Sequence, residues 1–268
     1  MKRIKQQLKN VWKFRSFVIT AVYNEFRTRF ARSGLGMAWM VLNPLAQVVV
    51  YAFVLSQVMK AKLGGIGSEY AYPIYLLAGL VMWNFFVEIV GRLTGIFVDN
   101  GHLLKKMAFP KLILPTVAVG SSLVSYMVLL FSMLIIFALL GHTPGWSALF
   151  WLPVLTLVLL VFSVGFGLLL GILNVFVRDT GQVMGIVMQF WFWLTPIVYV
   201  ADVLPDQYRW ILLLNPLTPV AEGFHAVLVY GVSPAIWPLC YPFLLAVLFL
   251  SMAGILLFKG GEEMTDVL

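Results

Sequence analysis

Apolar and polar residues alternate along the chain in long blocks, with polar clusters between extended hydrophobic runs. A helix needs roughly 20 predominantly apolar residues to cross the hydrocarbon core of a bilayer. Six runs come near this length: 35–59, 73–98, 112–140, 149–175, 183–200 and 235–258. The sequence therefore predicts an all-α integral membrane protein with six transmembrane helices.

The residues before the first run follow a different pattern, with apolar side chains at three- and four-residue steps between basic neighbours. This spacing places them on one face of a helix that lies in the membrane interface. The apolar positions are Phe14, Phe17, Val18, Ala21, Val22, Phe26 and Phe30. Gly34 and Gly36 then predict a turn, because glycine weakens a helix and lets the backbone bend sharply. We expect 1–34 to be a cytoplasmic segment containing this amphipathic helix, and 35–268 to be one six-span membrane domain.

A seventh apolar run, 210–230, contains Pro216, Pro219, Glu222 and His225. Proline frees backbone groups that need partners at membrane depth, so this run makes a poor straight span. The segment 201–234 is therefore predicted to be an outer loop with one or two re-entrant helices between the fifth and sixth spans. A seventh span, which would place the C-terminus outside, is the alternative.

Composition and charge agree with a membrane location. The chain is 62% hydrophobic and 11% charged, which excludes a soluble globule with a polar surface. With the N-terminus inside, the predicted cytoplasmic segments are 1–34, 99–111, 176–182 and 259–268. They hold nine, three, one and one of the 18 Lys and Arg residues, respectively. This bias follows the positive-inside rule and predicts that both termini are cytoplasmic.

Motifs for catalysis or nucleotide binding do not occur in the sequence, which has neither a phosphate-binding loop nor a His-Glu-x-x-His helix. The single cysteine, Cys240, and three histidines on separate segments provide no metal-ligand spacing. We expect no catalytic residue and no metal site on this chain. Glu88 and Arg92, four residues apart inside a predicted span, are interpreted as a structural ion pair. An external energy source is therefore favoured over an ion gradient.

Several short motifs occur in a characteristic order: RTRFARSGLGMAW at 27–39, LNPL at 42–45, NVFVRD at 174–179, LTPIVY at 194–199 and LNPLTP at 214–219. In this order and spacing the chain resembles the permease subunits of type-2 ABC exporters, which move polysaccharides such as O-antigen, capsule and teichoic acid. The resemblance covers nearly the whole chain and includes the six-span plan.

The resemblance implies a homodimer in the bacterial inner membrane, bound to two separate ATP-binding subunits that carry ATP and Mg. The polymer would pass between the two permeases, and the expected cargo is O-antigen on undecaprenyl diphosphate. Membrane lipids are further expected partners, and nucleic acid is not. An ABC exporter of drugs or lipids is one alternative. A membrane-embedded enzyme acting on polyprenyl-linked substrates is the alternative from another class.

The same resemblance implies a coupling helix between the second and third spans, at 99–110, that docks on the ATPase. The residues expected to make this contact are Asn100, His102, Leu103, Leu104, Lys105 and Lys106. A basic loop that only sets membrane topology is the alternative, but it explains the two lysines and not His102, Leu103 and Leu104.

The substrate would need cations for its diphosphate and flat rings for its sugars. The guanidinium groups of Arg27, Arg29 and Arg32 are predicted to bind the diphosphate at headgroup level, with attraction to ordinary anionic lipids as the alternative. The predicted glycan channel consists of Trp83, Phe85, Phe86, Phe190, Trp191, Trp193 and Tyr199. An interfacial aromatic belt and ordinary helix packing are the alternative for these rings.

Overall fold

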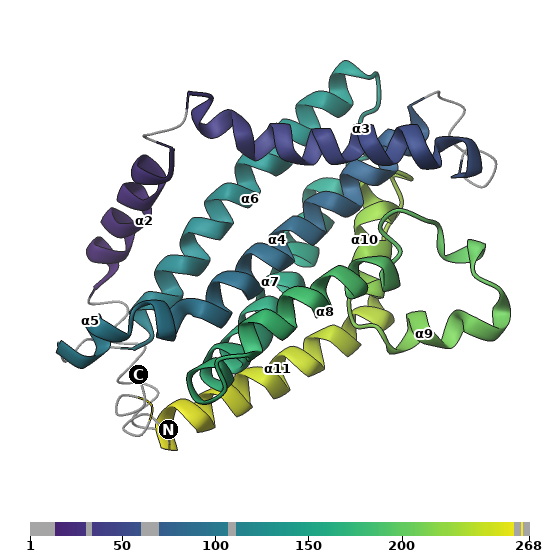
Figure 1. Cartoon of the computed structure of the whole chain (residues 1–268). Helices are drawn as coiled ribbons and strands as arrows, with labels where there is room; N and C mark the ends of the chain where they lie inside the picture. The colour runs from purple at the N-terminus through teal and green to yellow at the C-terminus, as the bar shows by residue number, and fades with distance from the viewer. Residues whose placement is uncertain (1–13, 31–33, 60–69, 107–110, 260–263, 265–268) are drawn as a thin grey trace.

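The computed structural model describes residues 14–30, 34–59, 70–106, 111–259 and 264, and the regular structure within them is helical. The longer helices are α2 (Arg15–Phe30), α3 (Trp39–Met59), α4 (Ala71–Asp99), α6 (Ile113–Leu139), α7 (Ser147–Phe176), α8 (Thr180–Leu194) and α11 (Ile236–Lys259). The shorter ones are α5 (Gly101–Lys106), α9 (Arg209–Leu214) and α10 (Thr218–Leu228). Figure 1 shows the long helices packed side by side in one bundle, with α2 beside it and α9 projecting from its opposite end.

Among the described residues, four helices are long and apolar enough to cross a membrane: α4, α6, residues 150–176 of α7, and residues 236–257 of α11. They coincide with four of the six predicted spans. The other two predicted spans fall on α3, whose apolar part is Trp39–Tyr51, and on α8. The 15 residues of α8 reach only about 22 Å. Over the described residues the structure confirms the predicted helical class and several helices that are long and apolar enough to span a membrane, and the count of six stays a prediction.

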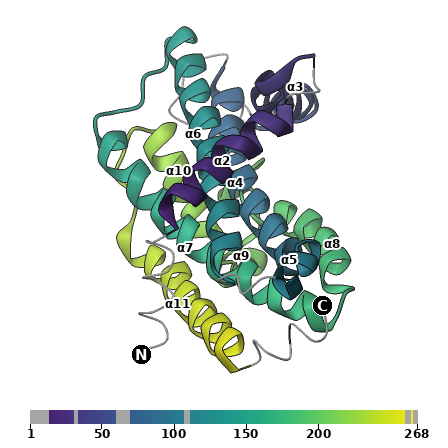
Figure 2. The same cartoon turned by 90° about the vertical axis from the view of Figure 1, so that its left-hand side faces the viewer.

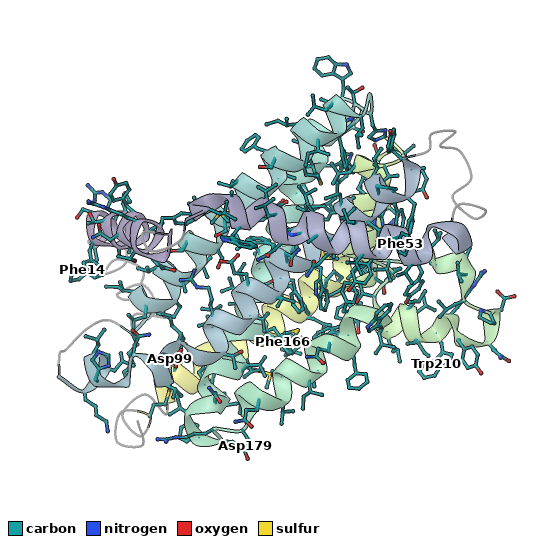
Figure 3. The ribbon with its side chains drawn as sticks, turned by 45° about the horizontal axis from the view of Figure 1, so that its top comes forward. Phe14, Phe53, Asp99, Phe166, Asp179 and Trp210 are labelled. Carbon is teal, nitrogen blue, oxygen red and sulfur yellow. The ribbon has the colours of Figure 1, made fainter. Side chains whose placement is uncertain are left out.

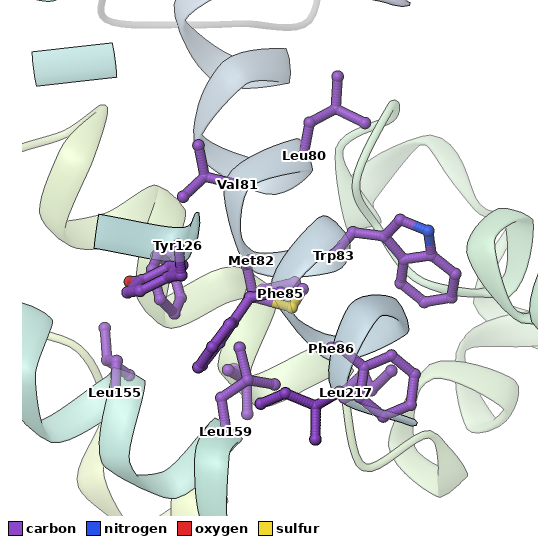
Figure 4. Close-up of a cluster of buried hydrophobic side chains, with 14 of the residues drawn as sticks. Leu80, Val81, Met82, Trp83, Phe85, Phe86, Tyr126, Leu155, Leu159 and Leu217 are labelled. Carbon is purple, nitrogen blue, oxygen red and sulfur yellow. The ribbon is translucent and has the colours of Figure 1, made fainter. Parts of the chain in front are cut away.

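α4 lies at the centre of the bundle, in contact with α3, α6, α7, α8 and α10. Its buried residues occur on every side of the helix, which is typical of a helix surrounded by protein. The ring of Phe85 stacks on Tyr126 of α6 with 4.2 Å between centroids, and Phe86 stacks on Phe162 of α7 at 6.0 Å. Figure 4 shows that Trp83 points away from the side where Tyr126 lies. The two sides of α4 therefore have different neighbours.

Glycines on α7 allow its close approach to the helices on either side. A Cβ atom on Gly171 would collide with the backbone oxygen of Leu93 in α4, and one on Gly167 would lie 2.9 Å from the Leu93 Cβ. On the other side, a Cβ on Gly165 would lie 2.9 Å from the backbone oxygen of Ala246 in α11. Small residues of this kind allow the backbones of two membrane helices to come into close contact.

α2 lies against α6 (Figure 2). Val22, on the predicted apolar face of α2, packs close to Gly120 of α6. A Cβ atom added to Gly120 would lie 3.1 Å from the Val22 side chain. After α2 the backbone turns into α3 through a 3-10 turn at Gly36–Ala38, and Gly36 has a φ of 51°, a left-handed conformation that favours glycine. The predicted glycine turn is confirmed, and at least part of the apolar face of α2 contacts protein.

The predicted outer loop contains two helical segments, Asp206–Leu214 and Thr218–Leu228, which bend by 97° relative to each other. The bend occurs at Asn215, whose side chain accepts hydrogen bonds from the Trp191 indole N–H (2.8 Å) and the Leu217 backbone N–H (3.0 Å). Its amide nitrogen donates to the Leu194 carbonyl and the Thr195 hydroxyl. One side chain therefore joins the end of α8 to the break between α9 and α10.

α10 packs into the bundle against α4 and α7. The fully buried ring of His225 stacks on Tyr75 of α4 with 3.7 Å between centroids, and its Nε2 lies 3.2 Å from the Tyr75 carbonyl oxygen. The hydroxyls of Tyr72 and Tyr75 donate to the carbonyls of Val198 and Tyr199, each at 2.9 Å. The non-helical chain after α8 is thus supplied with partners, as a backbone at membrane depth requires.

Candidate functional site

A groove of about 680 Å³ lies between α3, α4 and α8, with one contribution from α7. Its α4 wall extends from Leu80 to Gly95, which corresponds to about 22 Å along the helix axis. The facing wall is the α8 segment from Gly181 to Trp193, and Gln47 and Tyr51 of α3 close one side. Four glycines, Gly91, Gly95, Gly181 and Gly185, line the groove, and having no side chain they leave backbone at its surface.

Aromatic rings form the wall of the groove at the end away from α5. Phe192 of α8 stacks on Tyr51 of α3 with 5.9 Å between centroids and meets Trp83 of α4 edge to face at 5.4 Å. Trp193 packs edge to face against both Tyr51 and Phe192, at 6.2 and 5.5 Å. Rings from three helices therefore present apolar faces and edges to the same hollow.

Amide side chains supply the polar part of the groove. Gln47, Asn84 and Gln189 come from α3, α4 and α8, in that order, and all three line it. Asn84 is distinctive because its amide nitrogen is buried and has no hydrogen-bond partner within the described structure. A buried donor without a partner costs free energy, on the order of 1–3 kcal/mol. Because that nitrogen has almost no surface accessible to solvent, it lies behind the groove surface and not on it.

The groove also contains an amide whose hydrogen bonds are complete. Asn174 of α7 donates to the Thr94 carbonyl at 3.0 Å and accepts from the Gly181 backbone N–H at 3.1 Å. It thereby ties the end of α7 to α4 and to the start of α8. Asn174 therefore helps to fix the shape of the groove.

The predicted channel aromatics divide between the groove and the core. Trp83 and Trp193 line the groove. Phe85 and Phe86 are buried in the contacts of α4 with α6 and α7, while Trp191 packs on Phe86 and Phe166 and bonds to Asn215. Phe190 is 69% exposed on another face of α8, and Tyr199 lies in the turn after α8. The groove residues Tyr51 and Phe192 did not figure in the predicted channel.

An ion cluster borders the groove. Arg92 of α4 pairs with Glu25 of α2 and, at 3.8 Å, with Glu88 one turn earlier on its own helix. Glu25 also accepts a 2.7 Å hydrogen bond from the hydroxyl of Ser121 in α6. The predicted Glu88–Arg92 pair is confirmed, but Glu25 was missed. Its signal in the sequence is that it stands as the single acid among the first 34 residues.

This cluster lines a second hollow of about 430 Å³, which shares Val87 and Gly91 with the groove. Its other lining residues are Glu25, Glu88 and Arg92, so two carboxylates face one guanidinium. The side chains in the Glu25–Arg92 pair are 32% and 24% exposed, and screening by water is therefore incomplete. The ion pairs and the Ser121 hydrogen bond therefore join helices α2, α4 and α6 at this point.

The predicted coupling segment contains α5, which follows α4 after Asn100 alone. The amide nitrogen of Asn100 donates to the Ile96 carbonyl at 2.9 Å and caps the end of α4. His102, Leu103 and Lys105 are exposed, while Leu104 is buried, so its side chain does not reach the surface. The side chain of Lys106 and residues 107–110 lie outside the described residues. Docking by this segment stays a prediction.

The predicted diphosphate site is only partly described. Arg27 is exposed on α2, whereas the side chain of Arg29 and the whole of Arg32 lie outside the described residues. Figure 3 shows Asp99 at the end of α4 and Asp179 before α8 at one end of the bundle, with Trp210 of α9 at the other. That Arg27, Arg29 and Arg32 act together stays a prediction.

Comparison with known proteins agrees with the membrane architecture. A family model described as "ABC-2 type transporter" matches residues 17–229. The chain is 26% identical over 97% of its length, and 98% of the relative's, to the O-antigen export system permease protein RfbA of Myxococcus xanthus. It is 24% identical to RfbA of Klebsiella pneumoniae over 80% of each chain. It is also 26% identical to the polysialic acid transport protein KpsM of Escherichia coli, over 89% of this chain and 91% of that one.

Proposed function

The chain belongs to the ABC-2 type transporter family, and from this membership we propose that it is the permease subunit of an ATP-driven polysaccharide exporter. The observation that carries the proposal is similarity over nearly the full length to a protein named as an O-antigen export permease. A glycan carried on a lipid diphosphate, of the O-antigen type, is the proposed cargo. ATP would be hydrolysed on a separate subunit.

The proposed topology has six spans, with α3 and α8 as the first and fifth, and both termini in the cytoplasm. On this topology α9 and α10, with their bend of 97°, form a re-entrant unit on the outer side. α5 and the turn between α7 and α8 then face the cytoplasm. The broken backbone around Asn215 can lie at membrane depth because it is buried within the bundle.

We further propose that two copies of the chain form the translocation path, with the groove as part of it. The α4 wall carries one ring and one amide, Trp83 and Asn84, and continues with the apolar residues Val87 and Val90. Many weak and similar contacts let a polymer slide, because none of them traps it deeply. The three N-terminal arginines remain the proposed contact for the lipid diphosphate.

Deleting the gene in its host tests the proposal. We expect surface polysaccharide to disappear and lipid-linked polysaccharide to accumulate inside the cell, because the polymer is made but not exported. Complementation with the wild-type gene should restore the surface polymer. Unchanged surface polysaccharide would favour an exporter of drugs or lipids, and loss of the polymer from both places would favour a biosynthetic enzyme.

Docking of α5 on the ATP-binding subunit leads to a second prediction. Leu103 is 37% exposed, whereas Leu104 is 6% exposed and packed in the core. Leu103→Asp should therefore abolish co-purification of the ATP-binding subunit with little effect on the thermal stability of the permease. Leu104→Asp should lower stability instead, because it buries a carboxylate.

The matched control is Leu213→Asp on α9, an exposed leucine at the opposite end of the bundle. It should retain the ATP-binding subunit. Co-purification that survives Leu103→Asp unchanged would remove α5 from the proposed contact.

A further inference from the structure

The side chain of Asn215 joins two helices, α8 and α10, that differ in how firmly the rest of the chain holds them. We infer that Asn215 is a positioning residue, which sets the rotation of α8 about its own axis by tying the end of this helix to α10. The inference rests on the proposed function, because it takes the groove as part of the transport route. It adds the residue that decides which face of α8 forms the groove wall.

α10 is the firmly held partner. Eight of its 11 residues are buried, and the ring of His225 stacks on Tyr75 of α4. A Cβ atom added to Gly79 of α4 would lie only 3.0 Å from the His225 Nε2, so the histidine occupies the space that this glycine leaves open. A helix packed this closely cannot turn without breaking these contacts. α10 is therefore a fixed reference for whatever is attached to it.

α8 is held much less by packing. It lies at the edge of the bundle (Figure 2), and Phe192 is the one buried residue among its 15. Consecutive residues of an α-helix are about 100° apart, so a turn of this size would replace a groove-facing ring by its neighbour. Within this chain, apolar packing alone leaves the rotation of α8 weakly determined, and a directional contact is needed to fix it.

The amide of Asn215 supplies that contact and uses all of its hydrogen-bonding positions. Its Oδ1 accepts from the Trp191 indole N–H at 2.8 Å and from the Leu217 backbone N–H at 3.0 Å. Its Nδ2 donates to the Leu194 carbonyl at 3.1 Å and to the Thr195 hydroxyl at 2.9 Å. An asparagine amide has two acceptor positions and two N–H donors, and an aspartate has no donor. The four partners therefore require asparagine in one orientation.

Trp191 transmits this contact to the groove wall. Its indole N–H donates to Asn215, and its backbone carbonyl accepts from the Thr195 hydroxyl at 2.8 Å. Both ends of the residue are thus held toward the break between α9 and α10. Phe192 and Trp193 follow at about 100° and 200° around the helix, and both line the groove. Fixing the direction of Trp191 fixes the face of α8 on which these two rings lie.

Phe190 gives a way to measure the rotation. It lies about 200° from Phe192 around α8 and is 69% exposed on another face. Phe192, in contrast, stacks on Tyr51 of α3 with 5.9 Å between centroids. Cysteines that replace Tyr51 and Phe192 should therefore cross-link readily. Cysteines that replace Tyr51 and Phe190 should cross-link only when α8 has turned.

The test uses the full-length permease in lipid nanodiscs, with Cys240→Ser to remove the single cysteine of the chain. The first reporter pair is Tyr51→Cys with Phe192→Cys, and the second is Tyr51→Cys with Phe190→Cys. A short bifunctional thiol reagent is added, and the rate of cross-linking is measured for each pair. Links between two copies of the chain are recognised by their doubled mass on a non-reducing gel and are counted separately.

Two further substitutions weaken the joint, and two controls leave it intact. Trp191→Phe keeps a ring but removes the indole N–H, and Asn215→Asp removes both amide donors. The matched control is Tyr241→Phe, which removes the 3.0 Å hydrogen bond from the Tyr241 hydroxyl to the Leu214 carbonyl, beside Asn215 but not on α8. The second control, Leu104→Asp, is expected to lower stability at the other end of the bundle and shows the effect of general loosening.

Trp191→Phe should raise the cross-linking rate of the second pair about fivefold, because one lost hydrogen bond shifts the balance between the held and the turned helix by about that factor. Asn215→Asp should raise it at least as much, since it loses two donors. The first pair should not become faster, and neither control should change the second. An unchanged rate in Asn215→Asp, or an equal rise in Leu104→Asp, would overturn the inference.

Export relates the rotation to transport. In the deletion strain, Trp191→Phe and Asn215→Asp should reach the membrane in wild-type amounts but restore less surface polymer than Tyr241→Phe does. The loss should follow the order of their cross-linking rates. Full export by a variant whose α8 turns freely would show that the rotation does not matter for the transport route, and the positioning role would be wrong.

Failure of the inference can be told from failure of the proposed function. Cross-linking uses no polysaccharide and tests the joint at Asn215 whether or not the chain exports one. If the deletion leaves the surface polymer intact, the proposed function fails while the cross-linking result stands. If the wild-type gene restores export but the second pair reacts equally in every variant, the chain is a polysaccharide permease in which Asn215 does not position α8.

Discussion

Gly171→Ala is expected to lower the stability of the permease, although alanine in place of glycine normally stabilises a helix by roughly 0.5–1 kcal/mol. The added Cβ would collide with the Leu93 backbone oxygen, which cannot rotate away as a side chain would. Accommodation requires α7 and α4 to separate, and overpacking of this kind costs about 1–3 kcal/mol or more. Heating the purified protein and measuring the fraction that remains monodisperse would show a lower midpoint than that of the wild type.

Gly254→Ala in α11 is the matched control, since a Cβ there meets nothing within 4 Å. The same substitution should leave stability unchanged or raise it slightly, because only the helix preference of alanine acts. The two variants therefore have opposite expected signs. A Gly171→Ala protein as stable as Gly254→Ala would mean that α4 and α7 do not pack as closely as described.

Arg92→Leu should have the other large effect, a loss of about 2–3 kcal/mol of folding stability. Removing the guanidinium leaves Glu25 and Glu88 near each other without their shared partner, and an uncompensated carboxylate in a partly buried site is expensive. The loss should exceed that of an exposed pair because these side chains are shielded from water on most sides. Thermal unfolding in detergent measures it.

Arg209→Leu provides the comparison. Arg209 pairs with Asp202 and Asp206 at 3.8 and 3.1 Å, but those aspartates are 84% and 89% exposed. Exposed pairs contribute about 0–1 kcal/mol, so this variant should lose little. Adding Glu25→Gln to Arg92→Leu should recover part of the loss, since the stranded charge is then removed. Strictly additive effects would argue against a direct Glu25–Arg92 interaction.

The parts of the fold that could be predicted from the sequence depend on short-range patterns. The apolar runs of α4, α6, α7 and α11 exceed the length of a soluble helix, and Glu88 and Arg92 are one turn apart on the same helix. Glu25 could not be linked to Arg92 in this way, because 67 residues separate them and the contact depends on how α2 lies against α6.

The candidate site was harder to predict for a related reason. Four consecutive aromatics at 190–193 point in all directions around α8, and helix rotation alone decides that Trp193 faces the groove while Trp191 bonds to Asn215. The same applies to the neighbours Leu103 and Leu104, of which one is exposed on α5 and the other is buried. Asn84 is visible in the sequence as a polar residue inside an apolar run, but its amide is uncharged.

The shortness of α8 has a consequence for the lipid around it. On the proposed topology, its reach of about 22 Å falls short of a hydrocarbon core of roughly 30 Å, and the chain after Thr195 continues as a turn held by Tyr72 and Tyr75. A bilayer adapts to a short hydrophobic segment by becoming thinner beside it. The membrane next to the groove would therefore be locally compressed, which shortens the distance that a lipid-anchored headgroup has to travel between the two leaflets.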